Sequence, residues 1–493
     1  MSAANIILGR LFGTQGTQSV YFAPLAWLWN ERQQFAYRYV KFDLSKLLQV
    51  AASVVGSRSC IQCSNFTMDD GREIIAKLPN PNAGRPHFTT ASEVATMDFL
   101  RNVLGLPNPL GAEYILIEKQ AGVELTGVWD IVKGRQKVQI LDQVVDIERR
   151  LAATKFFKFG SLYYEDNLPD NLDSPSPLYL DLTGNEVWNK TVGIGPTNQR
   201  SFFDIARGEL DIERGPWSTI TEFMRAIAQR EFATAKAGLR CPLMPEGLFS
   251  GPRQYQPRLI KKLSALKNYL KVAPHVLPEN TATHATVLWH GDLHSQNTFV
   301  DPEDPGRILG IIDWQFVSAC PLFMQVGRPA FLDYNGPVPE SLEKVALPPD
   351  FSSLDPDEQK KAKTLHRTQT LHNLYLNTLR HQVSVVPGLI LMDYEPLLNS
   401  LLRDVGKEWA HIFSNEEIQQ QEQDGELWAR GVALMNAFVC DTGCFKHWDG
   451  MVGNMDYESS GRALDEGVKR FLGREAGNEE EHREWLNSLP FVD

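Results

Sequence analysis

Two short apolar segments late in the chain, each leading into a carboxylate, constrain the fold more than any other feature. The first, 287–290, leads into Asp292, and the second, 308–312, leads into Asp313. The stretch between them is rich in Pro, Gly and Asp, which is typical of a chain reversal. We therefore predict that the two segments are strands of one hairpin that brings Asn297 close to both aspartates.

A carboxamide between two carboxylates suits phosphoryl transfer. The transition state of that reaction needs a metal to bridge phosphate oxygens and a carboxylate to receive the proton of the attacking hydroxyl. Amide and carboxylate oxygens are ligands that Mg²⁺ accepts in proteins. The alternative is a Gly-Asp turn that joins two core strands without a chemical role, which leaves the spacing of the three polar groups unexplained.

The sequence His-Gly-Asp-Leu-His-x-x-Asn, which begins at His290, and the later Ile-Ile-Asp-Trp resemble the aminoglycoside phosphotransferase and choline kinase superfamily, relatives of protein kinases. The resemblance implies an α+β, protein-kinase-like fold of two lobes. It makes Asp292 the catalytic base, Asn297 and Asp313 the magnesium ligands, and His290 a support of the loop. It also implies ATP and Mg²⁺ as cofactors and a small molecule as phosphoryl acceptor.

Three other segments, which begin at Thr89, Gly160 and Arg214, are similar to the fungal phosphotransferase-family proteins named for altered inheritance of mitochondria. This likeness implies a mitochondrial location, with the cytoplasm as the alternative. The first thirty residues contain Arg10 and no acidic residue, as in a weak transit peptide. Alternatively, this arm packs its aromatic residues on the rest of the protein.

The resemblance also assigns residues in the N-terminal part. Lys77 ends a predicted strand after the turn at Asp70 and Gly71, where kinases keep the lysine that holds the α- and β-phosphates. Glu93, on the next predicted helix, would be its partner. The alternatives are that Lys77 is a solvated strand end and that Glu93 belongs to a capping box with Thr90.

The segment 111–118 is predicted to be one buried strand, and the resemblance places backbone groups around Glu118 and Lys119 against the adenine of ATP. Here the chain departs from the family pattern. No glycine lies between Gly56 and Gly71, so a glycine-rich loop over the phosphates is missing. The strand that usually precedes the adenine-binding hinge is also expected to be absent. We therefore predict a truncated small β lobe.

The remaining chain is predicted to be mainly helical. We expect an N-terminal arm at 1–41, a shortened nucleotide-binding lobe at 42–121, and a large helical lobe at 122–493 with the catalytic and metal loops at 287–315. The segment 160–216 is an elaborated loop or an insertion. Amphipathic patterns predict helices at 42–55, 137–157, 217–237, 256–272 and 359–381, and the polar segment 415–426 is predicted to be a solvated helix.

Composition excludes several classes of function. The net charge of −12 argues against nucleic acid as a partner, and no apolar run of 18 residues is present to form a transmembrane segment. The six cysteines are scattered and are expected to be free thiols rather than zinc ligands or a redox pair. Two functions are favoured, a Mg-ATP-dependent phosphotransferase and a non-catalytic kinase-fold protein that acts by binding in mitochondria. A plain helical interaction protein is a third alternative, supported only by the long helical second half, and the oligomeric state is not determined by the sequence.

Overall fold

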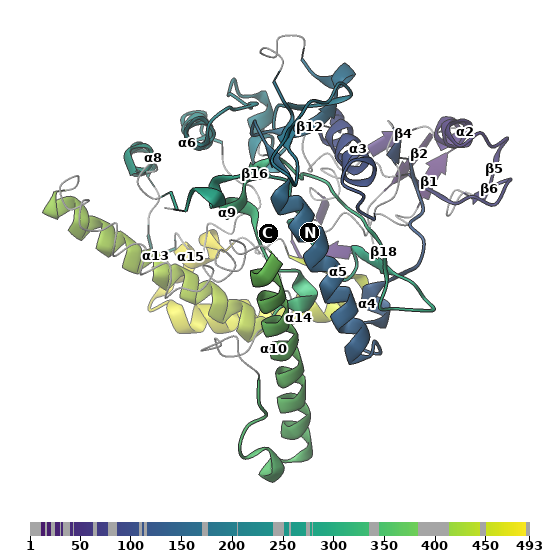
Figure 1. The fold of residues 1–493 in the computed structure, drawn as a ribbon. Helices are drawn as coiled ribbons and strands as arrows, with labels where there is room; N and C mark the ends of the chain where they lie inside the picture. The colour runs from purple at the N-terminus through teal and green to yellow at the C-terminus, as the bar shows by residue number, and fades with distance from the viewer. Residues whose placement is uncertain are drawn as a thin grey trace.

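The computed structural model of the chain is a mixture of helices and small antiparallel sheets (Figure 1). It describes most of the 493 residues, in these ranges: 11–14, 17–20, 25–29, 31–32, 40–42, 44–62, 67–76, 86–107, 111–112, 116–169, 176–204, 206–239, 251–255, 258–272, 277–278, 280–334, 345–382, 414–443 and 450–489.

The segment 44–118 alternates short strands with two helices. The turn predicted at Asp70 and Gly71 is confirmed, because the Gly71 N–H donates to the Met68 carbonyl at 3.0 Å and Gly71 has a φ of 84° that glycine adopts without strain. Strands β7, β9 and β8 form one antiparallel sheet, and β5 pairs with β6. The elements are α2 (Leu44–Val54), β5 (Cys60–Gln62), β6 (Thr67–Met68), β7 (Ile74–Ala76), α3 (Pro86–Asn102), β8 (Gly111–Ala112) and β9 (Leu116–Glu118).

Two predictions for this segment are wrong. Helix α3 begins at Pro86, a residue favoured in the first helical turn, so Thr90 lies inside the helix and forms no capping box with Glu93. The single strand predicted at 111–118 is instead the hairpin of β8 and β9, so a two-residue strand does precede the hinge strand.

The helices of the larger part lie close to their predicted positions. Helix α5 (Gly134–Ala153) packs against α10 (Pro356–Gln382), whose far end extends away from the other helices, and α6 (Ile220–Lys236) contacts α8 (Leu259–Val272) (Figure 1). Helix α5 ends before the predicted residue 157 because the chain enters strand β11 (Lys155–Phe156), which pairs on both sides.

The segment 160–216 is folded rather than an idle loop. It contributes two strands to a five-stranded sheet of order β14-β13-β11-β16-β19, and its other two strands pair with each other. The strands are β12 (Ser161–Tyr164), β13 (Tyr179–Leu180), β14 (Glu186–Val187), β15 (Val192–Gly195), β16 (Thr286–Val287) and β19 (Cys320–Pro321).

The described residues 25–29 of the N-terminal arm pack on the C-terminal part of the chain, as the alternative prediction held for the aromatic residues of the arm. Its strand β3 (Leu25–Trp27) pairs with β20 (Met451–Gly453), and Trp29 lies in a buried cluster with Phe438, Phe471 and Trp485. The helices that supply this cluster are α13 (Asn415–Thr442), α14 (Tyr457–Glu475) and α15 (Glu479–Ser488). A separate three-stranded sheet joins β1 (Leu11–Thr14), β2 (Thr17–Val20) and β4 (Val40–Phe42).

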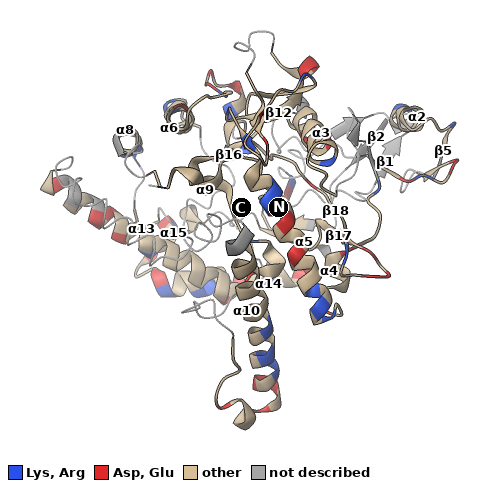
Figure 2. Ribbon diagram, viewed as in Figure 1, with Lys and Arg blue, Asp and Glu red and all other residues tan. Residues whose placement is uncertain are grey.

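The first part of α13 is a solvated helix, as predicted. Acidic residues occur along its outer end (Figure 2), and the described side chains of 415–426 are exposed apart from Asp424, which is half-buried and forms an ion pair with Lys261 at 2.6 Å. Among the described residues no helix has the length and apolar character needed to cross a membrane.

A buried carboxyl group joins helices α5 and α10. Glu148 on α5 is 3% exposed, and the hydroxyl of Tyr375 on α10 donates to it, 2.9 Å from Oε1 and 2.8 Å from Oε2. Burial raises the pKa of Glu148 from its ordinary value of 4.5 to about 8. The folded protein therefore keeps this carboxyl group protonated near neutral pH.

This pKa difference predicts a pH-dependent stability. Below pH 4.5 the group is protonated in both states, whereas between pH 4.5 and about 8 only the unfolded chain ionises it. The free energy of unfolding should therefore fall as pH rises through this window, by up to about 1.4 kcal/mol per pH unit. In thermal melts from pH 5 to 8, Glu148→Gln should show a flatter pH dependence than wild type, and Asp142→Asn, an exposed change on the same helix, should not. An unchanged slope in the Glu148 variant would contradict the assignment.

Candidate active site

The two aspartates of the predicted site are carried by loops around one β-hairpin. Strand β17 (Thr298–Val300) pairs antiparallel with β18 (Ile308–Ile311), and β10 (Val123–Glu124) adds to the other side of β17. The hairpin predicted between 287–290 and 308–312 is therefore wrong, because β16, at the start of the first segment, pairs with β11 and β19 rather than with β18. The loop after β16 reverses the chain first, so the strand that reaches β18 is the one that follows Asn297.

His290 connects the two loops. Its Nδ1 accepts a hydrogen bond from the Asp292 backbone N–H at 3.3 Å, and its Nε2 lies 3.0 Å from the carbonyl of Ile312. This pattern requires a neutral ring with the proton on Nε2. Burial lowers the pKa of His290, in agreement with a neutral ring, although the Ile312 carbonyl and the charges of Asp313 and Asp292 act in the opposite direction.

Trp314 fixes the ring of His290 from one side. The two rings meet edge to face with centroids 4.6 Å apart, and the indole N–H of Trp314 donates to the Ile311 carbonyl at 3.0 Å. Both side chains are buried. The loops that carry Asp292 and Asp313 are therefore held in one geometry by a packed, hydrogen-bonded pair of rings.

The loop 290–297 is also held by the segments around it. The Ser295 carbonyl accepts from the Thr126 N–H of α4 (Leu125–Val128) at 3.1 Å, and the Leu293 carbonyl accepts from the Ala330 N–H at 2.9 Å. The Asn297 N–H donates back to the His294 carbonyl at 3.1 Å. The loop is thus held by backbone contacts from both sides, which fixes the position of the Asp292 side chain in advance.

Asp292 faces solvent from this rigid loop. Its side chain is 49% exposed, and its Oδ2 lies 3.7 Å from Nε2 of His294. His294 in turn accepts the Gln296 N–H on Nδ1 at 3.1 Å, which fixes the orientation of its ring. Sequence reasoning gave His294 no role, although its place in the motif was the available signal.

Asn297 and Asp313 offer the oxygen donors that magnesium requires. The Asn297 side chain is fully buried, and its Nδ2 donates to the Asp292 carbonyl at 3.0 Å, which fixes the direction of the amide oxygen. Asp313 follows β18 in a left-handed conformation with a φ of 66°, an arrangement that is unusual for a residue other than glycine. One amide and one carboxylate are a suitable partial ligand set for Mg²⁺, which keeps several waters and takes other oxygens from phosphates.

In the described part of the chain, no group of three or more His, Cys, Asp and Glu side chains is arranged to hold a metal by itself. Any magnesium bound here would therefore depend on Asp313, on the amide of Asn297, on water and on substrate oxygens.

The other predicted residues have different outcomes. Lys77 lies outside the described residues. Glu93 is 1% exposed within α3 and has no capping role. Because a buried carboxylate is costly without a partner, Glu93 needs a polar or positively charged neighbour. Glu118 ends β9, opposite Ile74 of β7.

Lys119 is engaged at the sheet edge. Its backbone N–H donates to the Glu73 carbonyl at 3.0 Å, and its Nζ forms an ion pair with the Glu73 carboxylate at 2.7 Å. Its N–H and its ammonium group therefore already have partners within the protein.

The chain after Lys119 contacts the β17–β18 hairpin. Gln120 donates through Nε2 to the Leu309 carbonyl at 3.1 Å and lies over Gly310. Gly122 has a φ of 97°, and a Cβ there would lie 2.4 Å from the Val300 carbonyl oxygen, so glycine is required. This close approach places the segment after β9 directly against β17 and β18.

A neutral histidine that supports an exposed aspartate, followed by a hairpin that ends in a second aspartate, is typical of the kinase-like phosphotransferases. Residues 245–327 match the sequence profile of the phosphotransferase enzyme family. A subtelomeric hrmA-associated cluster protein of Aspergillus fumigatus is 32% identical over 387 residues, which cover 69% of this chain and 72% of the relative. The chain therefore belongs to the phosphotransferase enzyme family, as its motifs indicated.

More distant relatives carry the name altered inheritance of mitochondria protein 9, mitochondrial. The one from Yarrowia lipolytica is 23% identical over 484 residues, which cover 82% of this chain and 80% of the relative. The one from Candida tropicalis is 25% identical over 405 residues, which cover 75% of this chain and 63% of the relative. No solved structure matches the chain.

Proposed function

We propose that this protein is a Mg-ATP-dependent phosphotransferase that acts on a hydroxyl group of a small molecule. The observation that carries the proposal is the His290 bridge, which links an exposed carboxylate at Asp292 to the loop of Asp313. Family membership supports phosphoryl transfer in general.

The residues of the site would have separate roles. Asp292 would accept the proton of the acceptor hydroxyl, and its exposure of 49% leaves room for that group. Asn297 and Asp313 would hold magnesium, which when bound neutralises charge on the transferred phosphate. His290 would act as a positioning residue, because it contacts both loops and is buried.

The nucleotide-binding residues are proposed from the resemblance. Lys77 would hold the α- and β-phosphates, with Glu93 as its ion-pair partner, and the burial of Glu93 supports such a pairing. The base would lie against the hinge strand near Glu118. Because the N–H of Lys119 donates to Glu73, contacts to the base there would use the remaining backbone groups.

Nucleotide binding should be weak. Without a glycine-rich loop the triphosphate loses backbone N–H donors, and each donor to a charged group contributes about 1.5–3 kcal/mol, or roughly ten- to a hundredfold in affinity. We expect Mg-ATP to raise the melting temperature only at high-micromolar to millimolar concentration. Inserting a glycine-rich turn between Asn65 and Phe66 should then strengthen binding by about tenfold or more for each donor regained. Low-micromolar binding by the unmodified chain would show that the missing loop does not limit affinity.

The second candidate is a non-catalytic kinase-fold protein that acts by binding in mitochondria. It is favoured by the absence of glycine between Gly56 and Gly71. Single-turnover transfer of the γ-phosphoryl group, or Mg-dependent hydrolysis of ATP, distinguishes the two. Nucleotide binding with neither reaction would support the second candidate.

We propose a mitochondrial location, supported by the names of the relatives and by a first segment of thirty residues that has no acidic side chain. Residues 1–45 fused ahead of a fluorescent reporter should direct it to mitochondria. The same fusion with Arg10→Glu should direct it less well, because transit peptides are basic. A reporter that stays in the cytosol with the unchanged segment would contradict the proposal.

A further inference from the structure

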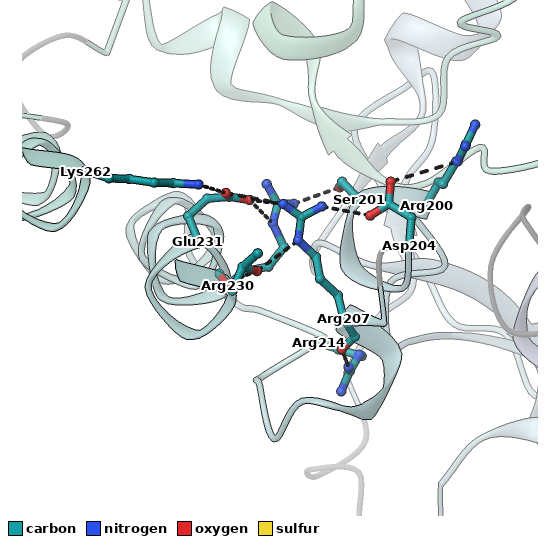
Figure 3. Close-up of polar contacts among 9 residues, drawn as sticks. Arg200, Ser201, Asp204, Arg207, Arg214, Arg230, Glu231 and Lys262 are labelled. Carbon is teal, nitrogen blue, oxygen red and sulfur yellow. Dashed lines mark hydrogen bonds and ion pairs between the residues drawn. The ribbon is translucent and has the colours of Figure 1, made fainter. Parts of the chain in front are cut away.

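A group of basic residues lies apart from the catalytic loops in the chain, where two short helical turns meet α6 and α8 (Figure 3). The turns are η4 (Arg200–Phe202) and η5 (Arg207–Glu209). We call this group the basic cluster; it consists of Arg200, Arg207, Arg230 and Lys262, together with the carboxylates of Asp204 and Glu231 that contact them.

The centre of the basic cluster is rigid. Arg207 donates to Asp204 at 2.8 Å, to Glu231 at 3.0 Å and to the hydroxyl of Thr234 at 2.9 Å. The turn that carries Arg207 is held by Arg214, whose Nη2 donates to the Arg207 carbonyl at 2.8 Å.

Arg230 is equally fixed. Its Nε donates to Glu231 at 3.0 Å, its Nη1 donates to Ser201 at 2.7 Å, and its guanidinium lies 4.6 Å from the ring centroid of Phe202. The side chains of Arg207 and Arg230 are only 12% exposed. Both guanidinium groups are therefore held in place before any ligand arrives.

The basic cluster contains more positive than negative charges. Its four cations contact two carboxylates, which leaves an excess of two positive charges in a protein whose net charge is −12. Burial lowers the pKa of Arg230, and the neighbouring Arg207 acts in the same direction against the carboxylates. A negatively charged ligand would relieve this imbalance.

Donors remain available for such a ligand. Arg230 has no acceptor for its Nη2 among the residues that the structure describes. Lys262 lies 3.8 Å from Oε2 of Glu231, and Arg200 lies 3.9 Å from Oδ2 of Asp204, distances too long for hydrogen bonds. The side chains of Lys262 and Arg200 are 52% and 47% exposed, so both can turn toward a ligand from opposite ends of the cluster (Figure 3).

We propose that the basic cluster binds a phosphate group, either as the free ion or as a phosphate monoester of a small molecule. A phosphate dianion matches the excess of two positive charges, and its oxygens accept several hydrogen bonds at once from guanidinium and ammonium groups. A single carboxylate would leave one charge uncompensated. This site goes beyond the proposed transfer reaction, which uses none of these residues.

Isothermal titration of the full chain with potassium phosphate, against potassium chloride at equal ionic strength, tests the proposal without nucleotide or magnesium. Wild type should bind phosphate specifically, and Arg200→Ala/Lys262→Ala should bind it about fivefold more weakly or worse. Lys360→Ala/Lys361→Ala removes the same charge from exposed positions on α10 and should bind as wild type does. No phosphate-specific binding, or an equal loss in both pairs, would overturn the proposal.

Further experiments distinguish a free phosphate ion from a phosphate monoester, and the basic cluster from the site of Asp292 and Asp313. Glycerol 3-phosphate that binds more tightly than inorganic phosphate would identify an organic monoester, whereas equal or weaker binding would identify the free ion. Arg230→Lys keeps the charge but loses the planar fork and should also weaken binding, with its fold checked by circular dichroism. Phosphate binding should be unchanged in Asp313→Asn, because the basic cluster shares no residue with the proposed magnesium site. The two proposals can therefore fail independently. Succinate binding as tightly as phosphate would overturn the assignment to phosphate.

Discussion

Asp292→Asn should lower Mg-dependent turnover of ATP by roughly 10²–10⁴-fold, the usual contribution of a general base. Asparagine has nearly the same shape but cannot accept the proton of the attacking hydroxyl. The side chain is 49% exposed, so the exchange should change the melting temperature very little. Loss of turnover with an unchanged fold would then report on chemistry rather than on stability.

A matched change on the same hairpin controls for general charge effects. Glu303→Gln also replaces a carboxylate by an amide, at an exposed position in the reversal between β17 and β18. It should retain the turnover of wild type. If the Asp292 variant and this control were equally active, Asp292 would have no part in the reaction.

Asp313→Asn should weaken the Mg-dependent part of ATP binding by about a hundredfold or more, because Mg²⁺ relies on one or two carboxylates in addition to substrate phosphates. Asparagine tolerates the left-handed backbone that residue 313 adopts, so the variant removes charge without adding strain. Calorimetry with ATP alone and with Mg-ATP measures the effect. Binding of ATP without magnesium should change little.

Two further variants serve as a control for charge and as a test of the second proposed magnesium ligand. Asp166→Asn makes the same exchange at an exposed position away from the hairpin and should leave the magnesium dependence unchanged. Asn297→Ala should weaken Mg-ATP binding less than the loss of a charge does, but it should also destabilise the fold, because its buried Nδ2 donates to the Asp292 carbonyl. An unaltered magnesium requirement in the Asp313 variant would refute the metal assignment.

Several features of the fold followed from local sequence. The turn at Gly71 depends on one residue that accepts a positive φ, and the long helices depend on a periodicity that a single segment contains. The motif around Asp292 fixed the order and spacing of the polar groups. These features were predictable because neighbouring residues alone decide them.

Other features could not be predicted locally. The capping box at Thr90 matched a real pattern, but α3 extends back to Pro86. Strand β16 was assigned the wrong partner because the pairing of a two-residue strand is decided by β11, more than a hundred residues earlier in the chain. The role of His290 as a bridge depends on the Ile312 carbonyl, which only the folded chain brings to its Nε2.

The sequence by itself determined the chemical groups of the site, their spacing in the motif and the family to which the chain belongs. The tertiary structure decided which groups are buried, charged or held apart. The basic cluster shows the difference, since its residues are spread from Arg200 to Lys262 and no periodic pattern connects them. The physical reason is that burial and electrostatic environment arise from contacts between distant segments, whereas sequence patterns report only on contacts between near neighbours.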